Sequence, residues 1–173
     1  TASIIRRKLM AITSAICNSF KSEILQGGHC LNASGSTAAG NTIKCALYSS
    51  NSATLSKSTT VYTAPADATA DPTNTYEVTT TGSGYTGGGS ALTNIDVALD
   101  SDTAVCDFSN ESWTSATFTA RGLLLYNTTA ITGFTTNRSI LAINFGGDKT
   151  VTSGTFTIEF PAAGASTAII QLA

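Results

Sequence analysis

The feature that most restricts the fold of this chain is an alternation of apolar and polar side chains in its second half. In residues 155–160, three large apolar side chains alternate with two threonines and a glutamate. A half-buried strand shows this period of two, whereas a helix repeats every 3.6 residues. A second alternating set predicts that one face of a long strand carries Ala116, Phe118, Ala120, Gly122, Leu124 and Tyr126. The chain must therefore form sheets.

Shorter apolar runs bounded by turn residues predict the remaining strands. They are Ile43–Tyr48, Tyr76–Thr79, Ala91–Leu99, Thr103–Phe108, Ile140–Phe145 and Ala168–Leu172, and a Ser/Thr/Ala-rich stretch at residues 49–75 is expected to be a loop. We expect a mainly β fold: an antiparallel two-sheet sandwich or jelly roll of about eight strands, with one N-terminal amphipathic helix. Residues 13–173 are expected to form a single domain.

The composition excludes some functions. Only 12% of the residues are charged and the net charge is −2, against about 25% charged residues in an average soluble domain. Without a basic field, we expect no nucleic-acid partner. No apolar run reaches the roughly 18 to 20 residues of a membrane span, so we expect no membrane partner.

A helix is predicted from Thr13 to Gln26. Ile12, Ile16, Phe20 and Ile24 recur every four residues and form one apolar stripe. Thr13 or Ser14 is expected to cap its start, and Gly27-Gly28 to end it. The stripe either covers a sheet or docks on a neighbouring subunit, so Ile16, Phe20 and Ile24 are candidate subunit or capsid contacts.

Residues 1–12 are predicted to be a basic N-terminal arm. Arg6, Arg7 and Lys8 are three of only nine positive residues in the chain, and they are further candidate contacts with a neighbouring subunit. The apolar residues that follow them imitate the start of a secretory signal, but polar residues from Thr13 onward end that match. A start-site choice or a cloning remnant is the alternative explanation of the first nine residues.

No catalytic or cofactor-binding pattern is found. His29 is the single histidine, and no nucleophile or carboxylate has a fixed relation to it in sequence. Cys17, Cys30, Cys45 and Cys106 lack metal-binding spacing, and we expect buried thiols. The acidic residues of 96–107 lack the central glycine of a calcium loop, and the Gly-rich run at 82–89 does not precede a helix. We therefore expect no enzyme activity, no cofactor and no metal.

Several blocks of the chain resemble one group of proteins when taken in order. They are AITSAICNSFKSEILQGGH, IKCALYSSNSATLSKSTTVYT, YEVTTTGSGYTGGGSAL, FTARGLLLYN and LAINFGGDKTVTSGTFTIEFP with the closing AIIQLA. From Met10 to Ala173, the chain is similar to small structural proteins of tailed bacteriophages. Proteins of that group begin near the position of Met10. The resemblance implies a virion component without catalytic or cofactor residues.

Within that resemblance, the leading hypothesis is a capsid decoration or cement protein on the outside of the phage head. Its expected partners are the major capsid protein or other virion proteins and further copies of itself, most plausibly as a homotrimer. The first alternative is a tail, baseplate or fibre-associated protein. The second is a carbohydrate-binding virion module, in which Tyr62, Tyr76, Tyr85 and Trp113 would stack on sugars.

Overall fold

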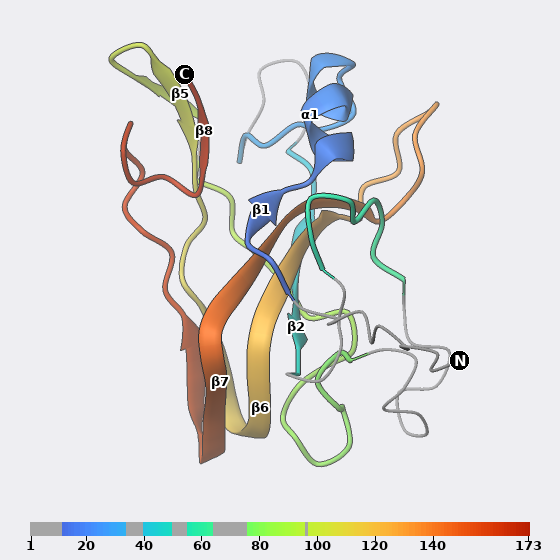
Figure 1. Ribbon diagram of the computed structural model, residues 1–173, viewed down its shortest axis with the longest axis vertical. Coiled ribbons are helices and arrows are strands. Elements are labelled where there is room, and N and C mark those ends of the chain that lie inside the picture. The colour runs from blue at the N-terminus through green and yellow to red at the C-terminus, as the bar shows by residue number, and fades with distance from the viewer. Residues whose placement is uncertain (1–11, 34–39, 50–54, 64–75, 96) are drawn as a thin grey trace, which may run out of the picture.

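The computed structural model describes residues 12–33, 40–49, 55–63, 76–95 and 97–173. Its elements are β1 (Ala15–Ile16), α1 (Asn18–Leu25), β2 (Ile43–Tyr48), β3 (Ser90–Ala91), β4 (Ala98–Asp100), β5 (Thr103–Cys106), β6 (Glu111–Asn127), β7 (Arg138–Ile158) and β8 (Ile170–Leu172). One sheet has the order β1-β7-β6-β2-β3, and a smaller sheet has the order β4-β5-β8 (Figure 1). All their pairings are antiparallel. The predicted mainly β, sandwich-like architecture with an N-terminal helix is confirmed.

The long hairpin of β6 and β7 organises the large sheet. Its pairing runs from Glu111 opposite Ile158 to Asn127 opposite Arg138. The two segments predicted in this region, Ile140–Phe145 and residues 155–160, thus belong to one long strand and its continuation. β2 pairs with the last six residues of β6 and has the bounds predicted for it. Apart from Lys44, its side chains are apolar on both faces, because both faces are covered by other parts of the chain.

This hairpin folds back on itself at its lower end (Figure 1). Ser115 and Ser153 both adopt a left-handed backbone conformation, with φ of 52° and 48°. They flank the Ala116–Gly154 pair, where the strand register is irregular. Beyond the corner, Trp113 and Phe156 pack against each other, and Phe156 contacts Phe118 on the other arm at 5.0 Å between ring centroids. One ribbon therefore supplies both layers of this part of the core.

A second irregularity corrects the predicted face of β6. Phe118 and Ala120 face the main core, as expected, but the register shifts between Ala120 and Gly122. Beyond that shift, Leu123 and Leu125 face the main core, while Leu124 and Tyr126 face a second cluster on the opposite side of the sheet. Ala120 and Gly122 are two residues apart in β6, whereas their partners Lys149 and Asn144 are five residues apart in β7. An irregularity of this kind can reverse the alternation of faces. The prediction that Leu124 and Tyr126 share a face with Phe118 is therefore wrong.

The helix is shorter than predicted. Residues 15–16 form β1, which pairs with β7, and α1 begins only at Asn18. Ser14 does not cap the helix, because its hydroxyl accepts a hydrogen bond from the backbone amide of Asn144. Cys17 occupies the N-cap position instead. The four-residue recurrence is misleading at its start, because Ile12 is buried in the second cluster rather than on the helix. The predicted end at Gly27-Gly28 is confirmed, and Gly27 has a φ of 77°.

Two predicted strands are reduced. The segment predicted as one strand from Ala91 to Leu99 is divided into β3 and β4, with a single bridge at Asn94 between them. Tyr76–Thr79 contributes only the bridge between Glu77 and Tyr48. Within the described part of the 49–75 segment, Val61 forms a bridge with Arg138. The other residues of that segment that bear on the loop prediction, 50–54 and 64–75, lie outside the described residues.

Candidate functional site

The predicted contact residues of the helix stripe lie mainly inside the protein. Phe20 is 2% exposed and belongs to the main core. Ile16, in β1, and Ile24 are partly buried and pack against that core. Ile24 also lines a surface pocket, described below. Of the two alternatives for the stripe, the described structure has it covering a sheet; Arg6, Arg7 and Lys8 lie outside the described residues.

His29 lies at the centre of a polar network that joins α1 to the large sheet. Its Nε2 lies 2.8 Å from Oε2 of Glu23, and its Nδ1 accepts a hydrogen bond from the amide nitrogen of Asn127 at 3.1 Å. The same amide nitrogen donates to Oδ1 of Asn41 at 2.7 Å. Burial is the main cause that lowers the pKa of His29 below 6.5, and Arg138 lowers it further, while Glu23 opposes them. The imidazole is therefore neutral, with its proton on Nε2.

Arg138 is the other charged member of this network. It is 1% exposed, and its guanidinium donates to the carbonyl oxygens of Gly28 at 2.6 Å and Thr135 at 2.5 Å. Its Nε lies 3.8 Å from Oε2 of Glu23, and its guanidinium carbon lies 5.4 Å from the ring centre of Phe134. The side chain thereby connects the end of α1 with the loop between β6 and β7. This arrangement is suited to holding two segments together.

The described geometry gives His29 a structural role. Both ring nitrogens are engaged, by Glu23 and by Asn127, so neither is directed at a nucleophile. Burial raises the pKa of Cys17 to about 11 and that of Cys106 to about 12, and it also raises that of Cys45. These three thiols stay protonated and unreactive at neutral pH. They are buried and form no disulfide, as expected.

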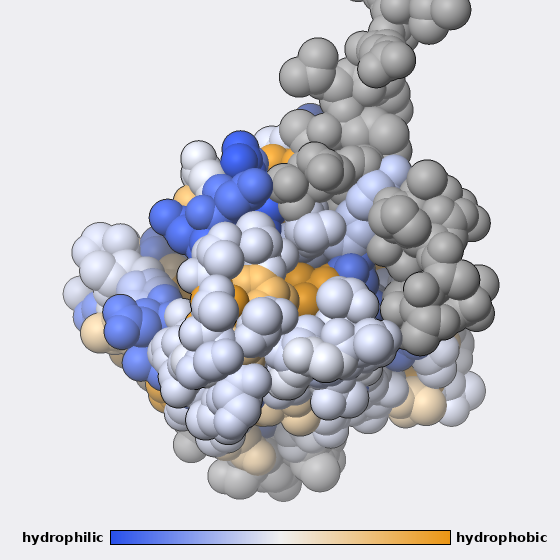
Figure 2. All heavy atoms as spheres, turned by 90° about the horizontal axis from the view of Figure 1, so that it is seen from below, coloured by the Kyte–Doolittle hydropathy of each residue, from blue (hydrophilic) through white to orange (hydrophobic). Residues whose placement is uncertain are grey.

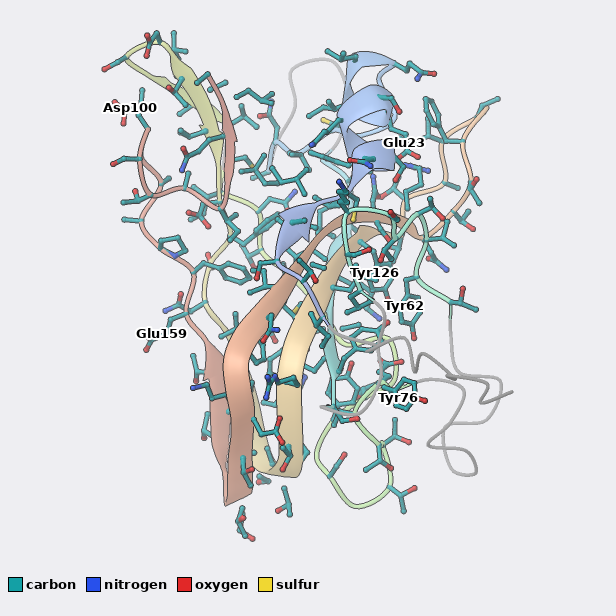
Figure 3. All side chains as sticks on the ribbon, viewed as in Figure 1. Glu23, Tyr62, Tyr76, Asp100, Tyr126 and Glu159 are labelled. Atoms are coloured by element: carbon teal, nitrogen blue, oxygen red, sulfur yellow. The ribbon has the colours of Figure 1, made fainter. Side chains whose placement is uncertain are left out.

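A second polar cluster surrounds the buried carboxylate of Glu77. Its oxygens accept hydrogen bonds from Tyr85 at 2.7 Å, Tyr62 at 2.9 Å and the backbone of Gly88 at 2.6 Å. Tyr62 stacks on Tyr126, with ring centroids 4.3 Å apart, and Figure 3 shows these two side chains together beside the large sheet. Burial first, and the Glu77 charge second, raise the pKa of Tyr62 and Tyr85. The phenols therefore remain donors to the carboxylate.

The placement of the aromatic side chains does not favour sugar stacking. Tyr62, Tyr85 and Trp113 are each less than a tenth exposed, so their faces are covered within the chain. Tyr76 is half-buried. The Asp100-Ser101-Asp102 segment is the turn of the β4–β5 hairpin, with a φ of 58° at Ser101. Among the described residues, no three His, Cys, Asp or Glu side chains are grouped closely enough to hold a metal ion.

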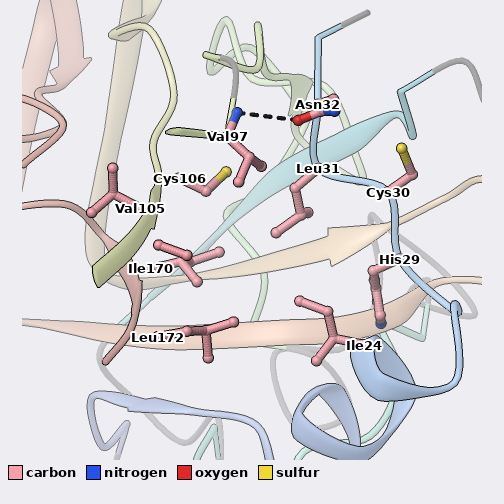
Figure 4. Close-up of a pocket in the computed structure, with 11 residues that line it drawn as sticks. Ile24, His29, Cys30, Leu31, Asn32, Val97, Val105, Cys106, Ile170 and Leu172 are labelled. Atoms are coloured by element: carbon pink, nitrogen blue, oxygen red, sulfur yellow. Dashed lines mark hydrogen bonds between the residues drawn. The ribbon is translucent and has the colours of Figure 1, made fainter. Parts of the chain in front are cut away.

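An apolar groove lies at the surface between α1 and the small sheet, and we call it the α1–β8 groove. Its pocket, of about 260 Å³, is lined by Ile24, His29, Cys30, Leu31, Asn32, Val97, Ala104, Val105, Cys106, Ile170 and Leu172 (Figure 4). Asn32 closes one end by accepting a hydrogen bond from the Val97 amide at 3.2 Å. Val97 is 44% exposed and Leu172 is 53% exposed. Apolar side chains thus remain in contact with water here.

A second pocket, of about 430 Å³, lies between the first part of β7 and the segment that runs from the end of β7 to Pro161. It is lined by Leu123, Ile143, Phe145, Lys149, Phe156, Thr157, Ile158, Glu159, Phe160, Pro161 and Ile169. The leucine, isoleucine and phenylalanine side chains that line it are all buried or partly buried. Seen from below, the molecule shows weakly polar side chains around a small apolar hollow (Figure 2).

The sequence reasoning missed the α1–β8 groove. Val97 and Leu99 belong to a segment that the sequence predicts as an ordinary strand, so no local pattern indicated that they are exposed. The sequence reasoning did not assign the partners of His29 either, which lie up to 98 residues away. Comparison with protein-family models, curated proteins and solved structures finds no match for the chain. No helix among the described residues is long and apolar enough to cross a membrane.

Proposed function

We propose that this chain is a structural subunit of a virus particle, acting as a decoration or cement protein on the capsid of a tailed phage. The observation that carries the proposal is a contrast in burial. The ionisable side chains that could do chemistry are enclosed, whereas several large apolar side chains are exposed. The imidazole of His29 and the carboxylate of Glu77 are both enclosed by partners within the chain. Among the described residues, the exposed large apolar side chains instead lie at the end of α1 (Leu25), between β3 and β4 (Ile95 and Val97) and in the small sheet (Leu99 and Leu172). Such a distribution favours function through contacts between proteins.

The reason to propose a phage particle is the resemblance of the sequence blocks to structural proteins of tailed phages. A cement protein binds the assembled shell and not its free subunits, so it stabilises the shell by mass action. A sheet with a long folded ribbon at one end and an apolar groove at the other suits a subunit that contacts two neighbours. Homotrimers on local threefold axes are the expected arrangement.

A tail, baseplate or fibre-associated protein is the second candidate, because the same resemblance covers it. Copy number separates the two. Quantitative mass spectrometry of purified particles is expected to find the protein in hundreds of copies per particle if it decorates the head. A dozen copies or fewer would identify a tail component, and absence from particles would contradict both.

A further inference from the structure

Two backbone amides fix the direction of the hydrogen bonds that reach Nδ1 of His29. The amide of Cys30 can only donate, and it donates to Oδ1 of Asn41 at 2.8 Å. The amide of Thr129 likewise donates to Oδ1 of Asn127 at 2.9 Å. The other end of the Asn127 carboxamide is therefore its NH2 group, which donates both to Asn41 and to Nδ1 of His29. In this arrangement Nδ1 can act only as an acceptor.

A second proton on the imidazole finds no acceptor there. Nε2 already donates to Oε2 of Glu23 at 2.8 Å, so the added proton would stand on Nδ1 and face the NH2 group of Asn127. Turning the Asn127 carboxamide over would not help, because its NH2 group would then face the amide of Thr129. Asn127 is fully buried and His29 is 8% exposed, so little of either is open to water. The protonated ring is therefore accommodated only if it leaves this position.

The charges around the ring do not offset this loss. On α1, Glu23 favours the protonated ring, but its Oε2 also lies 3.8 Å from Nε of Arg138 on β7. Arg138 opposes a second positive charge, and burial lowers the pKa of His29 by more than Glu23 raises it. β6 and the segment before β2 contribute only the neutral side chains of Asn127 and Asn41 to the network.

His29 belongs to a segment that forms one wall of the α1–β8 groove. Residues 29–32 line the pocket on one side, and Cys106 and Ile170 line it on another (Figure 4). These two residues are 3% and 2% exposed and belong to the main core. Apart from His29, the titratable side chains that line the pocket are the thiols of Cys30 and Cys106. Displacement of residues 29–32 would therefore uncover part of the core without moving another charged group of the pocket.

Opening this wall leaves the long hairpin in place. β6 and β7 pair from Glu111 opposite Ile158 to Asn127 opposite Arg138, and only that last pair contributes side chains to the network around His29. Local opening of one segment costs less free energy than global unfolding. The groove can therefore open while the large sheet stays folded.

We propose that His29 is an acid-sensitive switch: when its imidazole is protonated, residues 29–32 separate from Asn127 and the α1–β8 groove opens down to Cys106. The closed state is favoured above about pH 6.5, where the ring is neutral in both states, and it loses that advantage as the pH falls. Below that pH, the ratio of open to closed molecules rises by up to about tenfold per pH unit. Such a switch is independent of whether the protein decorates a head or belongs to a tail.

Thiol labelling at two core cysteines tests the switch. A pyridyl disulfide reacts with thiols in acid as well as at neutral pH, and peptide mass spectrometry reports each cysteine separately. Cys106 lines the groove, whereas Cys45 lies fully buried in β2 and reports unfolding of the large sheet. Between pH 7.5 and 5.5, the labelling rate of Cys106 relative to that of Cys45 should rise about five- to tenfold. His29 is the single histidine, so no other side chain has its ordinary pKa in this range.

Two variants and a matched control separate this switch from a general effect of acid. His29→Gln removes the titrating group and should leave the labelling ratio constant across the range. Asn127→Asp supplies a carboxylate that can accept both the proton of Nδ1 and the Thr129 amide, so it should abolish the rise. Asn110→Asp adds the same charge at an exposed position and should keep the rise. Circular dichroism at each pH checks that the variants are folded.

Three results would overturn the proposal. They are a ratio that does not change with pH in the wild-type chain, a rise that persists in His29→Gln, and a rise of wild-type size in Asn127→Asp. If Asn127→Asp does not fold, the wild type and His29→Gln still decide. Particle copy number, measured separately, tests the proposed function and not this switch.

Discussion

The side-chain amide of Asn127 donates a hydrogen bond to Nδ1 of His29 over 3.1 Å and so fixes the imidazole in its neutral form. A proton on Nδ1 would replace this acceptor with a donor facing a donor. The charged groups around the ring are Glu23 on α1 and Arg138 on β7, and the arginine opposes a second positive charge. The folded state therefore binds this proton more weakly than the unfolded chain.

Stability should consequently fall on mild acidification. Because the pKa of His29 is lowered below 6.5 in the folded state, its contribution is fully present above about pH 6.5 and is lost as the pH falls toward the folded pKa. The slope is at most about 1.4 kcal/mol per pH unit. Urea unfolding at pH 7.5, 6.5 and 5.5 measures it, and His29→Gln should flatten the dependence. A steeper dependence in His29→Gln than in the wild type would contradict this assignment.

Arg138 and Arg121 provide a matched comparison of a buried and an exposed arginine. Arg138 is 1% exposed and donates to Gly28 and Thr135. Arg138→Ala should lower the free energy of unfolding by about 3 to 5 kcal/mol, because it leaves buried carbonyl oxygens without their donor and removes the positive charge beside Glu23. Arg121 lies 3.3 Å from Asp148 at the surface, so Arg121→Ala should cost less than about 1 kcal/mol. Equal losses in chemical denaturation would show that burial is not the deciding factor.

Phe20 and Leu25 give a similar comparison on a single helix. Phe20 packs edge-on against His29, with ring centroids 4.8 Å apart, and is enclosed by the main core. Phe20→Ala should lower the free energy of unfolding by about 3 to 5 kcal/mol through lost burial and a cavity. Leu25 is 88% exposed, and Leu25→Ala should stay within about 0.5 kcal/mol. Thermal and urea unfolding of both variants measure the difference; a loss below about 0.5 kcal/mol for Phe20→Ala would place its ring in water.

The hydroxyl of Tyr85 connects Glu77 to β2. It donates to Glu77 and accepts a hydrogen bond from the Leu47 amide at 3.0 Å. Tyr85→Phe keeps the ring and removes both bonds, so it should cost about 1 to 3 kcal/mol. Hydrogen exchange at the Leu47 amide should accelerate in the same variant. Unchanged stability together with unchanged exchange would show that water replaces the hydroxyl.

Local pattern was sufficient for some of the fold. The bounds of β2 follow from its apolar run between polar segments, and the end of α1 follows from Gly27, where a left-handed conformation is required. The start of α1 did not follow, because Ile12 and Ile16 keep a helical spacing while lying in extended chain. The hydrogen bond from the Cys17 amide to Ile140 decides that conformation, and it depends on a strand more than 120 residues away.

The candidate site depended still more on distant pairing. The alternation predicted that Leu124 and Tyr126 share a face with Phe118, but the register shift between Ala120 and Gly122 reverses the faces. Leu172 lies beside Ala104 and Leu99 because β8 pairs with β5, and β5 pairs with β4. In the sequence, β4, β5 and β8 each look like an ordinary short strand. The exposure of Leu99 is visible only when the three strands are placed together.

The corner of the β6–β7 ribbon yields the last prediction. Ser153 has a φ of 48°, and its amide donates to the hydroxyl of Thr117 at 2.9 Å on the facing strand. A residue with a Cβ pays about 1 to 2 kcal/mol for a left-handed conformation, and a β-branched residue pays more. Ser153→Val should therefore lower the free energy of unfolding by about 1 to 3 kcal/mol. Ser153→Gly relieves the conformational strain but makes the unfolded chain more flexible, so its net effect should stay within about 1 kcal/mol.

The matched control for this corner is Thr155→Val. Thr155 is an exposed residue of the same strand without a positive φ, and valine suits such a position, so its effect should stay within about 0.5 kcal/mol. Phe156, which packs against Trp113, reaches Phe118 only when the ribbon folds back, so Ser153→Val should also weaken the near-ultraviolet circular dichroism of the tryptophan. A Ser153→Val variant as stable as Thr155→Val, with an unchanged tryptophan signal, would show that the corner forms without this conformation.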